Sequence, residues 1–259
     1  MLRVNYVNDL HLDFYAEFTS AHNKQKRRVD QYVEQLFENT KEKGDVLVVA
    51  GDFGHVNAVS ALFLEAVAPH YDKVFATFGN HDLYLLSNKQ KKKFRNHSPN
   101  RAEELKDMTA HLDNVVWLDS ATVHTHQGVT FAGNPMFAAP ESPEEMLFYR
   151  QSMNDSRYVM FSAERTLESY HNEQMRDYNN TPDVDVFVSH FPLVRTPKFR
   201  NDASQGSYYN MVDELKAKHY FFGHVHQRDS FEKAGAMFHT HAVGYPDEGF
   251  TPSFGTVEI

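Results

Sequence analysis

Short apolar runs alternate with longer amphipathic segments along this chain. The apolar runs are rich in β-branched and aromatic residues, which predicts strands at Val4–Val7, Val46–Ala50, Val74–Phe78, Val115–Leu118, Val129–Ala132, Val184–Val188, Tyr220–Phe222 and Phe254–Val257. Helix-like periodicity falls between them, at Lys24–Glu42, Asn57–Pro69, Arg101–Leu112, Ser162–Tyr178 and Tyr208–Lys218. The pattern therefore predicts an α/β fold.

The spacing of the strands changes along the chain. Before Val115 strands and helices alternate, which favours parallel pairing through right-handed crossovers. After Val115 strands follow one another more closely, as in antiparallel hairpins. A mixed sheet, or two sheets packed together, fits this pattern better than one parallel sheet. The stretches Asn134–Pro143 and Pro192–Gly206 are predicted to be long surface loops.

Five predicted strands are followed directly by side chains that can bind metal. The first ends in Asp9 and His11, which point to the same side when the backbone is extended. The other four strand ends carry Gly51-Asp52, Gly79-Asn80-His81-Asp82, Ser189-His190 and Gly223-His224-Val225-His226. Glycine allows the backbone to approach closely at such points. The order of these motifs and their position at strand ends carry more weight than any one of them.

Composition narrows the possible chemistry. The 259 residues include 16 histidines and no cysteine, so disulfides, thiolate zinc sites and cysteine nucleophiles are excluded. A net charge of -9 works against nonspecific binding to nucleic acid or anionic membranes. The chain shows neither a secretory signal pattern nor an apolar run of about 18 residues, so we expect a cytoplasmic protein without a membrane span.

Taken in order, these motifs resemble the calcineurin-like metallophosphoesterase superfamily, in particular its compact prokaryotic and phage members. Met153-Asn154-Asp155 and Val243-Gly244-Tyr245 are also similar to those members, whereas Asn8 stands where a serine commonly precedes the first aspartate. The resemblance covers nearly the whole chain. It implies one domain over residues 1–259, built as a four-layer α/β/β/α sandwich with two packed mixed β-sheets and metals at the carboxyl ends of the strands.

The resemblance also implies two divalent metal ions. It assigns one ion to Asp9, His11, Asp52 and His226, and the other to Asp52, Asn80, His190 and His224. Asp52 bridges, because its carboxylate has one oxygen for each cation. The mixture of nitrogen and oxygen ligands suits Mn, Fe, Zn, Co or Ni better than Ca, and we favour Mn.

Two such ions, about 3.5–4 Å apart, can clamp a phosphoryl group and deprotonate a shared water, so that the bridging hydroxide attacks phosphorus in line. His81 is not a ligand in the family pattern. We expect it to act as a general acid or an electrostatic stabiliser, with Asp82 orienting its ring. The alternative is that His81 only positions Asn80.

The expected function is hydrolysis of phosphorylated small molecules or nucleotides. Phosphodiesters are favoured over monoesters, because the site opens between short loops rather than under a cap domain. One alternative is a metal-dependent nuclease acting on single-stranded or damaged DNA. Another is a non-enzymatic metal-binding scaffold, which the retention of every ligand position argues against.

Side chains outside the metal motifs suggest where substrate binds. Candidates are His55, Arg195 and Lys198, although His55 is equally well explained as a helix-start residue. The segment Asn88–Arg101 is basic and has no acidic residue, so it is either a substrate-attracting lip or a solvated loop. Two further His-x-His pairs are not expected to bind metal: His124 with His126, and His239 with His241, which could lie around the ligands.

Overall fold

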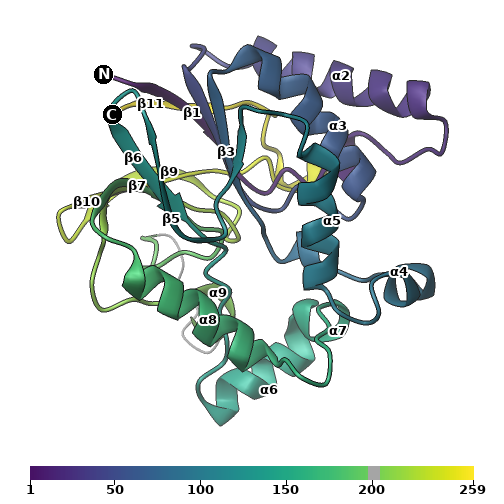
Figure 1. Ribbon diagram of the computed structural model, residues 1–259, viewed down its shortest axis with the longest axis vertical. Helices are drawn as coiled ribbons and strands as arrows, with labels where there is room; N and C mark the ends of the chain where they lie inside the picture. The colour runs from purple at the N-terminus through teal and green to yellow at the C-terminus, as the bar shows by residue number, and fades with distance from the viewer. Residues whose placement is uncertain (198–204) are drawn as a thin grey trace.

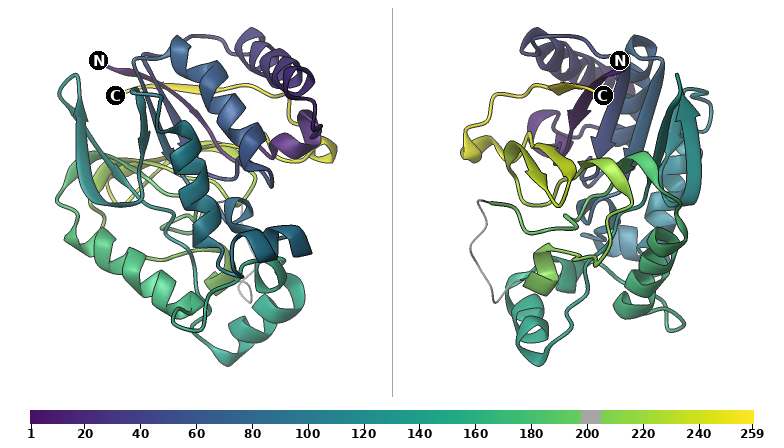
Figure 2. Two further views of the ribbon diagram at one scale, coloured as in Figure 1. Left: turned by 45° about the vertical axis from the view of Figure 1, so that its right-hand side comes forward. Right: turned by 90° about the vertical axis from the view of Figure 1, so that its left-hand side faces the viewer.

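Two mixed β-sheets packed face to face form the centre of the computed structural model, which describes residues 1–197 and 205–259. Helices lie on the outer face of each sheet, giving the four layers α/β/β/α (Figures 1 and 2). The predicted fold class is therefore confirmed. No helix in the described ranges is both long and apolar enough to cross a membrane.

The first sheet has the strand order β11-β1-β2-β3-β4. Its strands are β1 (Arg3–Val7), β2 (Val46–Ala50), β3 (Lys73–Thr77), β4 (Val115–Trp117) and β11 (Gly255–Glu258). The first four strands along the chain pair in parallel, and β11 joins β1 antiparallel. The carboxyl ends of β1, β2 and β3 consequently meet at one edge of the sheet.

The second sheet has the order β5-β6-β7-β8-β10-β9. Its strands are β5 (Ser120–His126), β6 (Val129–Gly133), β7 (Val184–Val188), β8 (Ala217–Phe221), β9 (Arg228–Lys233) and β10 (Ala236–His241). The outer strands β5 and β9 pair antiparallel with β6 and β10, while β6, β7, β8 and β10 pair in parallel. All the predicted strands are present within a few residues; β5, β9 and β10 are additions.

Successive side chains of a strand point to opposite faces of its sheet, one toward the other sheet and the next toward the outer helices. In β2, Val46 and Val48 face the second sheet, in a cluster with Phe131 and Val186. The intervening Leu47 and Val49 instead pack against the outer helices. All five β2 residues are buried, which explains why this strand is continuously apolar in sequence.

The outer helices confirm most of the predicted helical segments. Four lie close to prediction: α2 (His22–Glu38), α3 (Asn57–Val67), α5 (Pro99–Thr109) and α8 (Leu167–Asn180). In the described ranges the structure adds five α-helices and three 3-10 turns: α1 (Leu12–Tyr15), α4 (Asn88–Lys93), α6 (Pro143–Ser152), α7 (Asp155–Tyr158), α9 (Gln205–Tyr208), η1 (Ala68–His70), η2 (His81–Leu83) and η3 (Pro246–Glu248). Serine-based capping boxes begin α4 and α6.

The helix predicted at Tyr208–Lys218 is wrong. Helix α9 ends at Tyr208, and β8 begins at Ala217. Between them the backbone amide of Asn210 bonds to the Pro192 carbonyl, and its side-chain amide bonds to the Met136 carbonyl. These tertiary hydrogen bonds replace the helical ones, while Val212 and Leu215 pack against a core cluster that includes Tyr220.

The prediction of a surface loop at Asn134–Pro143 is also partly wrong. Residues 134–138 are buried, although the backbone is irregular. Helix α8 satisfies the polar groups there, since Gln174 accepts from the amide of Phe137 and from the side chain of Asn134. The Pro135 carbonyl accepts from His190. This stretch therefore supports the strand end that carries His190.

The two sheets are joined where β1 ends. Asn8 forms a parallel bridge with Ala242, directly after β10. Its side-chain oxygen accepts a hydrogen bond from the His241 amide at 2.6 Å, and its side-chain nitrogen donates to Asp9 Oδ2 at 2.6 Å. Asn8 thus ties the edge of the second sheet to the first metal-ligand candidate of the first sheet.

Candidate metal centre

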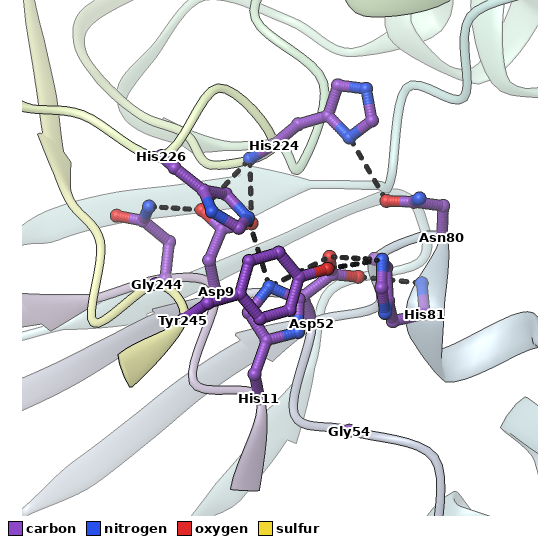
Figure 3. Close-up of polar contacts among 12 residues, drawn as sticks. Asp9, His11, Asp52, Gly54, Asn80, His81, His224, His226, Gly244 and Tyr245 are labelled. Carbon is purple, nitrogen blue, oxygen red and sulfur yellow. Dashed lines mark hydrogen bonds and ion pairs between the residues drawn. The ribbon is translucent and has the colours of Figure 1, made fainter. Parts of the chain in front are cut away.

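The backbone is strained where the strands end. Left-handed φ angles between 43° and 70° occur at five non-glycine positions of the predicted metal cage: Asp9, His11, Asp52, His224 and His226. Such conformations cost roughly 1–3 kcal/mol each, less for Asp and His than for bulky residues, and they concentrate at functional sites. At these positions the chain turns sharply after each strand, and the side chains gather at one place (Figure 3).

Two glycines allow these turns to approach each other. A Cβ on Gly79 would lie 2.1 Å from Asp52 Oδ1, and one on Gly51 would lie 2.6 Å from His190 Nδ1. Gly51 also has a φ of +83°. The Gly-Asp and Gly-Asn-His-Asp motifs therefore contain glycine for a steric reason.

One half of the centre is formed by Asp9, His11, Asp52 and His226. The Nε2 atoms of His11 and His226 are 3.0 Å apart, and His226 Nε2 is 3.5 Å from Asp9 Oδ1. Asp52 Oδ2 lies 4.0 Å from His11 Nε2. The structure thus brings together the whole ligand set predicted for the first ion.

The other half is formed by Asn80, His190, His224 and the second oxygen of Asp52. Asn80 Oδ1 is 2.9 Å from His190 Nε2 and 3.1 Å from His224 Nδ1. His190 Nε2 is 3.5 Å from Asp52 Oδ1. One oxygen of Asp52 therefore faces each half, as the bridging prediction requires.

Hydrogen bonds away from the centre set the tautomers of three of the four histidines. The contacts are His190 Nδ1 with the Ala50 carbonyl at 2.8 Å, His224 Nε2 with the Ser207 carbonyl at 3.2 Å, and His226 Nδ1 with Glu248 at 2.8 Å. These oxygens only accept, so the outward nitrogens carry a hydrogen, and each ring in the form that binds metal presents a lone pair from its inward nitrogen. Lone pairs directed at oxygen atoms fit a site built for cations.

The amide of Asn80 is oriented in the same way. Its nitrogen donates to Asp155 Oδ1 at 2.8 Å and to Tyr84 Oη at 3.2 Å, which leaves its oxygen facing the centre. Asp155 also accepts a short hydrogen bond from the Tyr84 hydroxyl. Burial raises the pKa of Asp155 to about 6.

The electrostatics of the centre also favour cations. Burial, then repulsion from Asp9 and Asp82, raises the pKa of Asp52 well above its usual value. Burial, then neighbouring imidazoles, lowers the pKa of His11 well below its usual value, and the pKa of His224 is lowered in the same way. Neutral imidazoles and crowded carboxylates are the state in which these groups bind metal ions.

His81 lies beside the centre, but Asp82 does not orient it. His81 Nε2 is 4.0 Å from Asp52 Oδ2. Asp82 instead accepts from the backbone amides of Asp52, Gly79 and Gly54 at 2.9, 2.8 and 3.3 Å. Its carboxylate is thus occupied in holding two strand-end turns together, and the expected contact with the ring next to it in sequence is absent from the described interactions. Burial, followed by repulsion from neighbouring histidines, lowers the pKa of His81 well below its usual value.

The three substrate-binding candidates are found in different settings. His55 lies behind His81, with 2.9 Å between His55 Nε2 and His81 Nδ1. Arg195 is exposed, and Lys198 lies outside the described residues. Their role in binding substrate stays a prediction.

The basic segment is divided by the fold. Asn88–Lys93 forms helix α4, whereas Arg101 is 1% exposed. Arg101 donates hydrogen bonds to the carbonyls of His81, Tyr84 and Gly54. It therefore braces the turns behind the centre and takes no part in a surface lip.

An open cleft of about 320 Å³ lies over the centre. Besides the predicted site residues Asp52, Asn80, His81, His224 and His226, it is lined by Tyr84, Ser152, Met153, Asn154, Tyr208, Val225, Tyr245 and Glu248. The Tyr245 ring stacks on His11 at 4.4 Å between centroids (Figure 3). Sequence reasoning missed Glu248, which no local motif signals, and gave Asp155 no role although it noted the motif containing it.

A two-sheet sandwich with His, Asp and Asn side chains gathered at its strand ends defines an α/β protein with a candidate metal-binding site. A family model described as calcineurin-like phosphoesterase matches residues 2–228, and the chain belongs to that family. The resemblance inferred from the motifs is therefore confirmed, and with it phosphoesterase chemistry and divalent metal ions.

Two individual proteins are also similar. Uncharacterized protein L509 of Acanthamoeba polyphaga mimivirus is 22% identical over 276 residues, covering 95% of this chain and 92% of that protein. The crystal structure of a phosphopantetheinyl hydrolase, PptH, from Mycobacterium tuberculosis superposes with a TM-score of 0.71 at 19% identity, covering 98% of this chain and 95% of that one. This second likeness shows a shared fold.

Proposed function

We propose that this protein uses two divalent transition-metal cations, Mn being favoured, to hydrolyse phosphodiesters of small or nucleotide substrates, and that residues 1–259 act as one domain. The observation that carries the proposal is the division of ligand atoms on either side of Asp52, with one carboxylate oxygen facing each group. When bound, the cations supply the Lewis acidity that activates water and offsets charge on the phosphoryl oxygens.

The protein's own contribution is to orient the ligands and supply a proton. Glu248 and Asp155 hold His226 and Asn80 in the orientation that binds a cation. His81 Nε2 faces the centre and donates a proton to the leaving oxygen. As the oxygen of the attacking water bonds to phosphorus and the water gives up one proton to the solvent, the bond from phosphorus to the leaving oxygen breaks. The leaving oxygen keeps the bonding pair and takes the proton from His81.

The cleft supports diesters over monoesters. Its described lining includes the carboxylate of Glu248 beside the metal ligands, whereas the other non-ligand side chains in it are uncharged or aromatic, apart from His81. A monoester carries about two negative charges near neutral pH, and a diester carries one, so the diester is repelled less. The open cleft also leaves room for a substituent on each side of the phosphate.

The test is to chelate the protein, reload it with each candidate metal, and measure metal content and hydrolysis together. Paired substrates would be bis(p-nitrophenyl) phosphate and p-nitrophenyl phosphate, followed by cyclic nucleotides, dinucleotides, mononucleotides, a phosphopantetheinyl diester and single-stranded DNA. We expect two metals per chain and a higher kcat/KM for the diester of the pair. One metal per chain would contradict the dinuclear proposal, and a preference for the monoester would contradict the substrate class.

A further inference from the structure

The ring nitrogen of His81 that faces away from the centre is held by a second histidine. His55 Nε2 lies 2.9 Å from His81 Nδ1, and His55 Nδ1 lies 2.9 Å from Asp13 Oδ2. We propose that Asp13 and His55 are positioning residues for His81, an inference that rests on the proposed function. They take the place that the sequence had suggested for Asp82.

The backbone is built to bring Asp13 to His55. Asp13 follows His11 by two residues, in the short helix α1, and Asp13 Oδ2 also accepts a short hydrogen bond from the backbone amide of His55. A Cβ on Gly54 would lie 2.8 Å from the same oxygen. Glycine at this position therefore lets the carboxylate reach both the amide and the ring of the next residue.

Neighbouring groups fix His55 on its other sides. Gln90 of α4 donates to the His55 carbonyl at 3.1 Å. The Tyr84 ring is nearly parallel to the rings of His55 and His81, with centroids 5.7 and 4.4 Å away. The side chains of Asp13 and His55 are 18% and 17% exposed, so water has little access to replace their contacts.

The hydrogen-bonding groups of Asp13, His55 and His81 determine which atom donates in each contact. The Asp13 carboxylate can only accept, so His55 Nδ1 carries a hydrogen. With its hydrogen on Nδ1, neutral His55 accepts at Nε2, so the hydrogen between the two rings belongs to His81 Nδ1. The proton that His81 gives to the leaving oxygen is then the second one, carried on Nε2 by the protonated ring. Rotating the His81 ring would break the hydrogen bond to His55, so the chain keeps His81 Nε2 directed at the cleft, where Tyr245 Oη lies 3.4 Å away.

The proposal predicts a defect in catalysis rather than in binding. In the metal-reconstituted protein, His55→Ala should lower kcat about 10- to 100-fold, with KM and metal content nearly unchanged, because His81 no longer holds one orientation. The loss should grow with the pKa of the leaving group across a series of aryl diesters. His55→Gln, which keeps a polar atom near His81, should recover part of the rate, and Asp13→Asn should show a smaller loss of the same kind. His22→Ala, at the exposed start of α2, is the control histidine.

The outcomes separate this inference from the proposed function. A wild-type protein that hydrolyses no diester would contradict the proposed function. An active wild type with an unchanged kcat in His55→Ala would overturn the positioning role. A uniform loss across leaving groups, or loss of metal in both His55 variants, would show that His55 supports the cage itself and would also overturn it. If His55→Ala does not fold, the comparison of His55→Gln with Asp13→Asn decides the question.

Discussion

Among the residues that the structure describes, two groups of buried or half-buried histidines differ in what their ring nitrogens face. In the metal centre, the inward nitrogens of His190, His224 and His226 face carboxylate or amide oxygens, so lone pair faces lone pair. In the second group, His239 contacts the Ser230 hydroxyl at 2.9 Å and His219 at 3.1 Å, and His241 contacts the Ser253 hydroxyl at 3.0 Å. Hydroxyls and neutral rings can donate as well as accept, so this group needs no cation.

The two groups of histidines also differ in where they lie in the fold. The cage residues follow strand ends, and five of them have left-handed backbone. His219, His239 and His241 lie within β8 and β10, in regular ladders. The comparison teaches that the number of histidines does not identify a metal site. Strand-end position and acceptor-only partners do.

The largest expected effect comes from removing Asp52, the carboxylate that faces both halves of the metal centre. Asp52→Ala should abolish binding of both ions and lower kcat about 10³-fold or more, because several kcal/mol of charge stabilisation is lost. Metal analysis and diester hydrolysis measure this. Asp185→Asn, on β7 and paired with Lys218, is the matched control. Turnover that survives in Asp52→Ala would contradict the bridging assignment.

A smaller effect is expected at the histidine beside the cage. His81→Ala should keep both metals and slow hydrolysis about 100-fold, most severely for poor leaving groups, because the proton donor is lost. Steady-state kinetics on aryl diesters of increasing leaving-group pKa test this. Equal losses for all leaving groups would assign His81 to the positioning of Asn80 instead.

The contact that sets one ligand's tautomer should have a still smaller effect. Glu248→Gln weakens the partner of His226 Nδ1, so we expect metal affinity to fall about 10-fold and activity to return at high metal concentration. Titration of the chelated variant with Mn, followed by activity, measures this shift. An activity deficit that excess metal does not repair would mean that Glu248 acts on substrate.

The smallest effect on activity is expected in the second histidine group. Burial lowers the pKa of His239 from 6.5 to about 4, so the unfolded state takes up a proton that the folded state excludes, and stability falls as the pH drops from about 6.5 to about 4. His239→Gln should reduce that slope by up to about 1.4 kcal/mol per pH unit and leave turnover nearly unchanged. Urea unfolding across this pH range measures the slope. A large loss of turnover would remove the distinction between the two groups.

Local patterns accounted for most of the fold and for the ligand candidates that the structure brings together at the strand ends. The motifs around Asp52, Asn80 and His224 are short and sit at strand ends, so order along the chain was enough to place them together. The partners of these residues were harder to predict. Glu248 and Asp155 reach the centre only through folding, and Asp82 was misassigned because a neighbour in sequence was taken for a neighbour in space.

Helix prediction failed for a related reason. The apolar spacing from Tyr208 to Lys218 is helical, but hydrogen bonds from Asn210 to distant backbone override it. Capping boxes at Ser87 and Ser142 were local signals that could have revealed α4 and α6. What a single sequence does not show is which long-range bonds compete with local periodicity.

The contact between the two sheets at Asn8 bears on how metal binding would affect stability. Each half of the centre takes ligands from both sheets: Asp9 and His11 meet His226, and Asn80 meets His190 and His224. Bound cations would therefore cross-link the two sheets at the edge that Asn8 already joins, and a cation present at about 100 times its Kd would add about 2.7 kcal/mol to the free energy of unfolding. Metal supply would then set the fraction of chains that are folded, as well as the rate of hydrolysis.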